Sequence, residues 1–574
     1  MARSNDAVAE ALREFAELLS LAAEDPFRVR AYEKAAQAVA EYPIAVDGLD
    51  VKDLDAIPAV GAHIAAKIRE LLSTGRIGDL DDLRSRVPAG LRILLDVPGL
   101  GPKRARQVYE ELGITSLPEL LDALHDQRLR ALRGWGRTSE ENLRRAIHLA
   151  QQAGARMQLG VALDIAEELV SELRRCPAVE FVTYAGSLRR MCETIGDVDL
   201  LVASSRPAEA MEAFAASPLV AEIAARGPTK CTAYTTKGVQ VDLRVVAPEV
   251  WGAALLYFTG SKAHNIQLRR IAQHLGLKLS EYGLERTDDG VTLAARTEEE
   301  VYGALGMAYI PPTLREERGE IEAAQRGDLP GVVEVTDIRG DLHVHTDLTD
   351  GLASLEEMVA AAQRHRYRYF AITDHAPLLH MERMTSEKAL EQRRVLRDLQ
   401  THTHMTLLHG SELNIQPDGS LDWDDEFLAG FDVLVASIHS HFTMGRDEMT
   451  ARLVRAVEHP AVNIIGHPTA RSIGHRPPIE FDAVAVFDAA ARAGTALEIN
   501  SFPDRLDLND ELARLAQDHG VVLAISTDAH ATRHLDNIRY GVATAQRAWI
   551  RPENVINTWP VGRLRAFLAK GRRP

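Results

Sequence analysis

The sequence lacks paired cysteines, long apolar runs and a surplus of positive charge. Its three cysteines are Cys176, Cys192 and Cys231, and no two of them are spaced as a Cys-x-x-Cys pair. We therefore expect neither a disulfide framework nor a cysteine-based zinc site, and a reducing compartment, the cytoplasm, fits this usage. No segment is apolar over the length of a membrane span, and none resembles a signal peptide.

Negative charge prevails in the composition. Aspartate and glutamate number 83 against 66 lysines and arginines, for a formal net charge of −17. This balance argues against a protein that coats nucleic acid by charge alone. Bases nevertheless outnumber acids between residues 86 and 150, so one basic segment lies within an acidic chain. At 574 residues the chain is too long for one core, and several domains are expected.

Residues 1 to about 150 carry apolar residues at helical spacing, interrupted by a recurring glycine-containing turn. The clearest copy is Pro98-Gly99-Leu100-Gly101-Pro102-Lys103. An earlier copy ends in Ala59-Val60-Gly61, with alanine where glycine is preferred, and a degenerate third contains Gly134-Trp135-Gly136. Backbone N–H groups at such a turn bind a phosphate without reading bases. The repeat predicts helix-hairpin-helix contacts to DNA at Gly61, Gly99, Gly101 and Lys103, and a plain αα-turn is the alternative for any single copy.

Three aspartates on predicted strands form a second pattern. Gly186-Ser187 precedes Gly196-Asp197-Val198-Asp199, and Asp242 lies in a later apolar strand. Residues two apart in a strand share a face, so Asp197 and Asp199 project together. Carboxylates this close repel unless cations neutralise them, and two Mg²⁺ ions would also clamp the oxygens of a phosphoryl transfer. The pattern predicts a nucleotidyltransferase whose Gly186-Ser187 turn and Arg189 face a triphosphate.

Seven short apolar runs in the C-terminal part end in metal-ligand residue types. They span residues 341–345, 370–375, 407–412, 433–439, 464–467, 496–500 and 522–530, and only the run with Glu498 and Asn500 lacks a histidine. Buried strands that end this way are typical of a parallel barrel with a catalytic site at its carboxyl rim. Imidazoles mixed with carboxylates favour Zn²⁺ or Mn²⁺ over Ca²⁺, and Glu412 is the simplest bridge between two ions. The runs predict a polynuclear metal site that hydrolyses a phosphate ester.

Over residues 1 to 312 the sequence resembles family X DNA polymerases, the polymerase beta-like group. The resemblance rests on the glycine–serine turn, the three aspartates and Tyr257-Phe258-Thr259-Gly260-Ser261 with Asn265. It implies that Asp197, Asp199 and Asp242 are catalytic and hold Mg²⁺ or Mn²⁺. The residues that it implies for nucleotide and template binding are Gly186, Ser187, Arg189, Gly196, Tyr257, Phe258, Gly260, Asn265 and Arg269.

The helices before residue 85 resemble the 5′-deoxyribose-phosphate lyase domain of the same family. Lys67 stands at the position of the Schiff-base lysine, and Arg28, Tyr32 and His63 stand where contacts to a 5′-phosphate are implied. The sequence departs from this pattern, because acids outnumber bases in this segment and Asp55 replaces a usual base. Lys67 is equally compatible with a solvated helix face.

From about residue 337 to 574 the sequence resembles the PHP (polymerase and histidinol phosphatase) superfamily. The resemblance implies up to three Zn²⁺ or Mn²⁺ ions. Their ligands would be His343, His345, Glu412 and Asp528 for the first, Glu412, His439 and His467 for the second, and Asp350, His375 and His530 for the third. His380 and Arg471 are candidates for contacts to a substrate phosphate. Other histidines, His365, His409 and His534 among them, are expected on the surface or in loops.

The two resemblances together imply a multidomain fold. Its parts are an all-α lyase-like domain over residues 1–85, helical fingers over 86–150, an α/β nucleotidyltransferase palm over 151–250, a thumb over 251–312, a charged linker over 313–336, and a distorted (β/α)7 PHP barrel over 337–574.

The implied function is template-directed filling of short gaps in DNA repair by a cytoplasmic, nucleoid-associated monomer. The barrel would add a 3′→5′ exonuclease or 3′-end-processing activity, cleavage at abasic sites included. The implied partners are gapped or nicked primer–template DNA and dNTPs, with no membrane. Two alternatives stay open: the barrel hydrolyses a small phosphoester or pyrophosphate, or the protein is a scaffold for DNA ends with weak catalysis.

Overall fold

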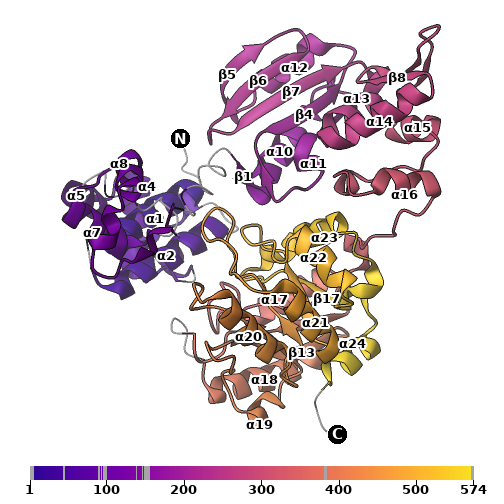
Figure 1. Ribbon diagram of the computed structural model, residues 1–574. Helices are drawn as coiled ribbons and strands as arrows, with labels where there is room; N and C mark the ends of the chain where they lie inside the picture. Colours follow the sequence, from indigo (N-terminus) through magenta and orange to yellow (C-terminus); the bar gives the residue numbers. More distant parts are fainter. Residues whose placement is uncertain are drawn as a thin grey trace. The chain divides into compact units, whose positions relative to one another are not determined.

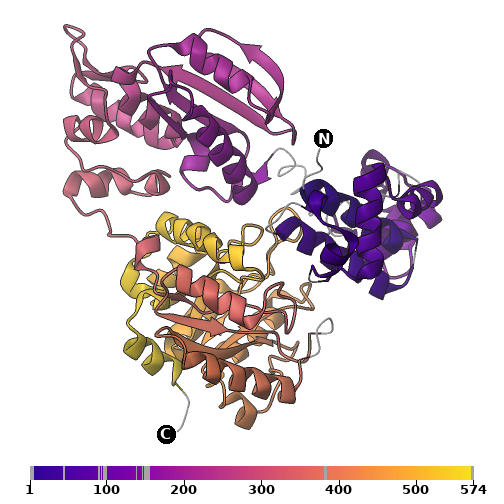
Figure 2. The same ribbon diagram turned by 180° about the vertical axis from the view of Figure 1, so that it is seen from behind.

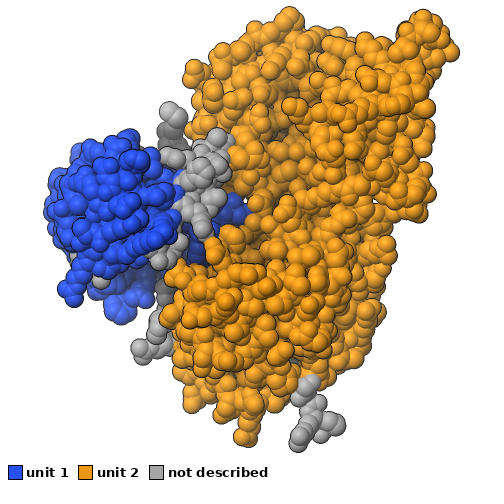
Figure 3. Space-filling view, viewed as in Figure 1, with its two compact units in different colours: residues 1–154, 350–354, 472–477 blue, residues 155–349, 355–471, 478–574 orange. Residues whose placement is uncertain are grey.

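The computed structural model describes most of the chain. The described residues are 5–22, 24–42, 46–57, 59–87, 91, 94, 100–137, 139–141, 143–144, 147, 156–379 and 384–570. Residues 1–154, with 350–354 and 472–477, form one compact unit, and the remaining residues form a second (Figure 3). The described helices contain none that is long and apolar enough to cross a membrane.

The described part of the first 150 residues is entirely helical, as the apolar spacing predicts. Its α-helices are α1 (Asn5–Leu21), α2 (Pro26–Glu41), α3 (Val51–Asp55), α4 (Ala62–Thr74), α5 (Gly78–Arg86), α7 (Pro102–Leu112) and α8 (Leu117–His125). Their apolar faces share one core, in which the rings of Phe15 and Tyr32 stack with centroids 4.2 Å apart. Packing of amphipathic faces, rather than helix propensity, holds such short helices together.

Two of these helices begin at the glycine turns. Gly61 caps α4 and Gly101 caps α7, where Pro102 takes the first helical position. Both glycines are exposed, and an added Cβ atom at either would meet nothing within 4 Å, so a ligand can approach each turn closely. Ala59 has φ +61°, a left-handed conformation that glycine adopts without strain. This explains why its position favours glycine.

A five-stranded sheet follows in the second unit, with strand order β2-β4-β7-β6-β5. The strands are β2 (Phe181–Tyr184), β4 (Val198–Ala203), β5 (Val220–Arg226), β6 (Lys230–Thr235) and β7 (Gln240–Val246). Helices α10 (Leu159–Leu173) and α12 (Pro207–Ala215) cover one face (Figures 1 and 2). The short helix α11 (Gly186–Arg189) and strand β3 (Thr194–Ile195) precede β4 in sequence, and β3 pairs with β1 (Met157–Gln158), which precedes α10. The three strands predicted for this region are confirmed.

A mixed segment continues from residue 251. It comprises α13 (Trp251–Thr259), α14 (Lys262–His274), an antiparallel sheet of β8 (Leu277–Ser280), β9 (Gly283–Arg286) and β10 (Thr292–Ala294), and helices α15 (Glu298–Ala304) and α16 (Glu320–Arg326). One core joins α13, α14, the sheet and α15.

The charged stretch from Arg315 to Glu320 is packed, which the expectation of a plain connector did not foresee. Arg315 is 0% exposed and donates to Glu298 at 2.6 Å and to the Ile310 carbonyl at 2.9 Å. Glu320 is also 0% exposed and pairs with His264 at 2.7 Å. The stretch has no apolar pattern because its buried residues are charges, each matched by a partner far away in sequence.

Seven parallel strands in sequential order form the last part, as predicted. They are β11 (Gly340–Asp341), β12 (Tyr369–Ile372), β13 (Thr406–Asn414), β14 (Val433–Ser437), β15 (Ile464–Ile465), β16 (Ala496–Asn500) and β17 (Leu523–Ser526). The helices that surround them are α17 (Leu355–Arg364), α18 (Ser386–Gln400), α19 (Asp425–Leu428), α20 (Arg446–Val457), α21 (Ala483–Ala493), α22 (Asp510–Asp518), α23 (Ile538–Arg547) and α24 (Val561–Leu568) (Figures 1 and 2).

The first and last strands meet just beyond their carboxyl ends. Val344 and Ala529 form a parallel bridge, and the His343 carbonyl accepts from Asp528 N at 3.0 Å. The sheet is thus nearly closed into a barrel. All seven strands deliver their ends to the same rim, which is where the predicted ligands lie.

Candidate functional site

Asp197, Asp199 and Asp242 come together at the edge of the palm sheet. Strands β4 and β7 are parallel neighbours in a register that sets Asp199 beside Asp242. One carboxylate oxygen from each of the three lies within 4.8 Å of the others. The structure therefore brings together the three residues that the strand pattern predicts.

The surroundings of Asp199 favour a bound cation. Burial, together with the charges of Asp197 and Asp242, raises the pKa of Asp199 to about 7. A metal ion would relieve both effects and restore the carboxylate. Thr232 and Gln240 orient Asp242 by hydrogen bonds, with the Gln240 amide at 3.1 Å from the carboxylate. Neither residue stood out in the sequence, because a polar residue on a half-buried strand is ordinary.

Gly186 has a backbone conformation and a location that only glycine fits. Its φ is +58°, and a Cβ atom there would overlap the carboxylate of Asp199.

The sequence analysis predicts that Gly186, Ser187 and Arg189 face a triphosphate. The structure differs for Arg189, whose guanidinium pairs with Glu298 at 2.6 and 2.9 Å and with Thr259 at 2.7 Å. Arg189 is thus tied to α15, because Glu298 is a buried carboxylate that needs a cation.

Two aromatic residues at the end of α13 lie beside residues of α14, and Phe258 lines a pocket with Asp199 and Asp242. Tyr257 and Phe258 meet edge to face with centroids 5.2 Å apart, and the Arg269 guanidinium lies 6.0 Å from the Tyr257 ring. Asn265 is 7% exposed and donates to the Tyr257 carbonyl at 2.7 Å. Its amide therefore shapes the turn in this structure, whereas the resemblance implies a contact to a base. Gly260 ends α13 with φ +70°.

The barrel rim gathers five imidazoles around one carboxylate, that of Glu412. His375, His439 and His467 approach it at 2.9, 3.1 and 3.0 Å, and the Nε2 atoms of His343 and His345 lie at 3.5 and 3.6 Å. Burial raises the pKa of Glu412, but the neighbouring histidines outweigh it and hold that pKa well below its usual range. Burial lowers the pKa of His467 to about 3, so this ring is neutral.

Hydrogen bonds outside the ligand set fix the ring tautomers. His343 Nδ1 lies 2.8 Å from Glu498, His439 Nδ1 lies 2.7 Å from Asn414, and His530 Nδ1 lies 2.7 Å from the Asp528 carbonyl. Each bond keeps a proton on Nδ1 and leaves the Nε2 lone pair for a metal ion. The sequence analysis did not predict a role for Glu498 or Asn414. A signal was available for Glu498, because its run, 496–500, has no histidine and yet carries ligand-type residues that face the rim.

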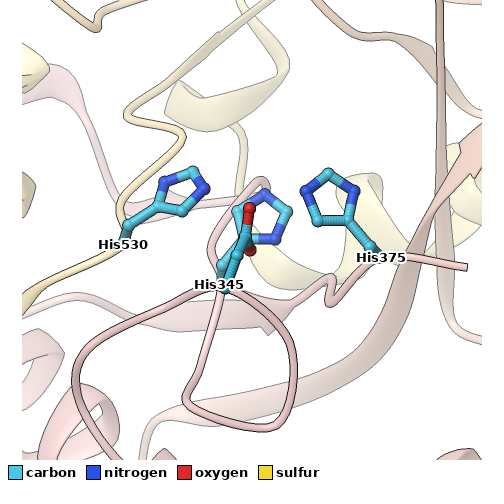
Figure 4. Close-up of side chains that lie close together, drawn as sticks. His345, His375 and His530 are labelled. Atoms are coloured by element: carbon cyan, nitrogen blue, oxygen red, sulfur yellow. The ribbon is translucent and has the colours of Figure 1, made fainter. Parts of the chain in front are cut away.

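The third predicted ligand group also forms at the rim. His345, Asp350, His375 and His530 each offer a ligand atom within 4.8 Å of the others. The His345 ring lies 4.5 Å from that of His375 and 4.4 Å from that of His530, and Figure 4 shows the three side chains side by side. The groups His343–His345–Asp528 and His375–Glu412–His439 satisfy the same test. His345 and His375 are thus shared between groups, a sharing that the sequence expectation did not include.

The donor set fits bound metal ions. One carboxylate cannot accept from five rings at once, whereas neutral imidazoles and carboxylates are the ligands that Zn²⁺ and Mn²⁺ take. Backbone strain accompanies them, because His467 and Asp528 have φ +28° and +53°. Residues held in such conformations cluster at functional sites.

Three further histidine and arginine expectations need correction. His409 lies in β13 at 4% exposure and accepts from Arg393 at 3.2 Å, so it belongs to the core. His534 is 6% exposed and accepts from the backbone N–H of His530 at 3.2 Å. The sequence predicted both on the surface because a histidine alone does not indicate whether a hydrogen-bond partner allows its burial. Arg471 pairs with Glu193 of the palm at 2.7 Å instead of facing a substrate phosphate. His380 lies outside the described residues.

The expected lyase residues lie in the helical unit. Lys67 pairs with Asp79 at 2.8 Å and with Glu70 at 3.5 Å. The hydrogen bond to Asp79 raises the pKa of Lys67, opposite to what an amine nucleophile needs. Tyr32 is 2% exposed, while Arg28 and His63 are exposed. Gly99 and the Lys103 side chain lie outside the described residues.

Family comparisons match most of this architecture. Helix-hairpin-helix models match residues 3–77 and, as a SAM-like tandem, residues 91–148. The DNA polymerase beta thumb model matches 254–316 and the PHP domain model 341–524. The DNA polymerase/3′-5′ exonuclease PolX of Bacillus subtilis is 36% identical over 97% of this chain and 98% of its own length.

The chain belongs to the PolX family. The chain is also 28% identical to DNA polymerase lambda of Rattus norvegicus, over 51% of this chain and 53% of that protein. It is 29% identical to a probable phosphatase of Syntrophotalea carbinolica, over 38% of this chain and 90% of that protein. The family X and PHP resemblances seen in the sequence are confirmed, as is the tandem of hairpins. The thumb match also takes in Arg315 and Glu316, the start of the packed charged stretch.

Proposed function

We propose that this PolX member is a template-directed DNA polymerase that fills short gaps in DNA repair and also carries a metal-dependent 3′→5′ exonuclease. One observation carries the proposal: an acid-only triad and an imidazole–carboxylate site occur together in a chain that matches a PolX protein from end to end. Its substrates are gapped or nicked primer–template DNA and dNTPs. We place it in the cytoplasm at the nucleoid, as a monomer.

The palm residues have separate tasks in synthesis. Asp197, Asp199 and Asp242 would hold Mg²⁺ or Mn²⁺, which supplies charge neutralisation for the attacking and leaving oxygens. Gly186 keeps the Asp199 carboxylate free of steric overlap. Tyr257, Phe258 and the charge of Arg269 provide a surface for the sugar and base.

The barrel residues would hold two or three Zn²⁺ or Mn²⁺ ions, which supply a hydroxide nucleophile near neutral pH. His343, His345 and Asp528 form one cradle, and Glu412 is placed to bridge toward His439 and His467. Glu498 and Asn414 keep the rings turned with Nε2 inward. Lyase activity stays outside the proposal, because the Lys67 amine is paired and protonated.

The helical unit would hold the DNA backbone. Gly61 and Gly101 each open a helix at an exposed turn, which suits a phosphate. Such contacts are independent of sequence and weaken with salt. They offer an acidic chain a local means of binding DNA.

A gapped duplex with a labelled primer tests the assignment of the two activities. Asp199→Asn should lower gap filling by about a thousandfold and leave primer degradation in Mn²⁺ intact. His343→Ala should do the reverse. Retention of both activities in either variant would show that the assigned residues are not catalytic.

A second candidate for the barrel is hydrolysis of a small phosphate ester. The likeness to a probable phosphatase favours it, because 90% of that protein is matched by 38% of this chain. Release of phosphate from a small ester, without shortening of a 3′-labelled primer in Mn²⁺, would select this function. The metal ligands indicate which type of bond is cleaved, but they do not determine which molecule contains that bond.

A further inference from the structure

One barrel loop contacts both the metal site and the palm. This loop, residues 501–508, joins β16 to α22. Phe502, near its start, meets the His530 ring edge to face at 6.4 Å between centroids. Arg505, at its centre, has its Nε 3.6 Å from Asp528 Oδ2. The loop thus places a cation beside a predicted metal ligand.

A second arginine fixes the backbone of the 501–508 loop. Arg471 is 8% exposed and donates from Nε to the Arg505 carbonyl at 2.8 Å and from Nη2 to the Leu506 carbonyl at 2.6 Å. The same Nη2 donates to Glu193 at 2.7 Å. One guanidinium therefore bonds to two loop carbonyls and one palm carboxylate, a geometry that the fork of arginine allows and a lysine does not.

The palm also touches the loop at a second point. Gly160 lies in the first turn of α10, and a Cβ atom there would be 3.0 Å from Pro503. This approach is tighter than ordinary van der Waals contact, so a larger residue at position 160 would have to displace Pro503 slightly. Two palm residues, Glu193 and Gly160, therefore contact the loop.

Arg505 has the surroundings of a residue that binds an anion. Its side chain is 26% exposed, so one part reaches solvent while another faces Asp528. At 3.6 Å this pair is looser than the pairs that Arg471 and Arg539 make with the palm. An arginine beside a metal site matches the planar oxygens of a phosphodiester.

We propose that Arg505 binds the phosphate of the exonuclease substrate, and that Glu193 of the palm positions it through Arg471. The inference rests on the proposed exonuclease function of the barrel. It makes the polymerase half a structural part of the nuclease site: Glu193 is a positioning residue, and Arg505 is the residue that touches substrate.

The chain offers a matched control for Glu193. Glu167, on α10 of the palm, pairs with Arg539 of the barrel at 2.9 Å, and the two palm carboxylates are 45% and 43% exposed. Arg539 lies in α23 and makes its other described side-chain hydrogen bond to Tyr540, whereas Arg471 bonds to the backbone of the 501–508 loop. Loss of either pair removes one ion pair between the palm and the barrel that involves a half-exposed carboxylate. Only the Glu193 pair includes an arginine, Arg471, that bonds to the backbone of Arg505.

A double-mutant cycle on the full-length, metal-loaded protein tests the proposal. Arg505→Ala should lower exonuclease kcat/KM by roughly a hundredfold, since it removes a charge contact to the reacting phosphate. Glu193→Gln should lower it by about tenfold, through misplacement. In the Arg505→Ala background Glu193→Gln should change it by less than about twofold, because the residue through which it acts is gone. Glu167→Gln should leave kcat/KM within about twofold in both backgrounds.

Binding of a deoxynucleoside 5′-monophosphate gives a readout that does not depend on turnover. Calorimetry on the Mn²⁺-loaded protein should show weaker binding for Arg505→Ala and Glu193→Gln, with bound metal and the melting temperature as in wild type. Gap filling should be unchanged in Glu193→Gln. An equal tenfold loss in the Arg505→Ala background, or equal behaviour of Glu193→Gln and Glu167→Gln, would overturn the proposal. If wild type itself shows no exonuclease activity, the proposed function fails instead, and the two failures are distinct.

Discussion

Three carboxylates meet in the palm without an imidazole, whereas five imidazoles meet the single carboxylate of Glu412 in the barrel. In the palm like charges crowd together, and the pKa of Asp199 rises to about 7. In the barrel the histidines stabilise the ionised carboxylate and lower the pKa of Glu412. The comparison shows that the crowded negative charge of the palm triad is not offset by its own residues, whereas the histidines of the barrel offset the negative charge of Glu412.

The two sites also differ in how their ligands are held. Asp199 and Asp242 take their places from strand register, and glycine at position 186 leaves them room. The barrel rings are oriented individually by Glu498, Asn414 and a backbone carbonyl. Hard carboxylates alone suit Mg²⁺, and oriented imidazoles suit Zn²⁺ or Mn²⁺. The two donor sets therefore differ in the kind of metal ion that they favour.

Replacement of Glu412 by Gln tests the centre of the barrel site and has the largest expected effect. The amide keeps the shape but removes the charge that faces five rings. We expect exonuclease activity to fall by about a thousandfold or more, with loss of bound metal, while gap filling is unchanged. Metal analysis alongside both assays checks it. Normal metal content in this variant would mean that Glu412 is not a ligand.

Replacement of Gly186 by Ala tests the palm site in the corresponding way. The new methyl group would overlap the Asp199 carboxylate in a backbone conformation that disfavours alanine. Gap filling should fall by roughly a hundredfold, and the exonuclease should be unaffected. Gly303→Ala is the control, since a Cβ atom there meets nothing within 4 Å. Similar rates for the two variants would remove the steric argument.

Replacement of Glu498 by Gln asks whether ring orientation matters in the barrel. Glu498 accepts from His343 at 2.8 Å and from the His467 backbone at 2.7 Å. Loss of such a partner weakens metal binding by about tenfold to a hundredfold. Competition with a chelator measures it, and the Mg²⁺ dependence of gap filling should not move. Unchanged affinity would indicate that strand geometry alone orients His343.

The sequence predicted the candidate metal ligands better than the residues that pair with functional side chains and hold them in position. Strand periodicity predicted the aspartate triad, and runs ending in histidine or aspartate predicted a metal site at the barrel rim, because both patterns are local. The individual barrel ligands came from the resemblance to the PHP superfamily. Arg189 was misread because its partner, Glu298, lies 109 residues away. The charged stretch at Arg315 was misread for the same reason, since a buried ion pair and a solvated one have the same composition. Contacts that are distant in sequence leave no periodic signal.

Glu298 offers the mildest test, because its charge is balanced by protein instead of metal. Burial would raise its pKa, but Arg189 and Arg315 outweigh burial and lower it to about 2. Because the pKa of Glu298 is depressed, this residue stabilises the fold at pH values above its unfolded pKa near 4.5, and the stability is lost as the pH falls toward 2.

The loss of unfolding free energy should reach about 3 kcal/mol at most. Urea unfolding of the metal-free protein at a series of pH values between 6 and 3 measures it, with Glu298→Gln as the comparison. The variant should be less stable at neutral pH and show a flatter pH profile, because no carboxylate remains to be protonated. An equally steep profile in the variant would assign the acid sensitivity to other carboxyls whose pKa is lowered in the fold, such as Glu316.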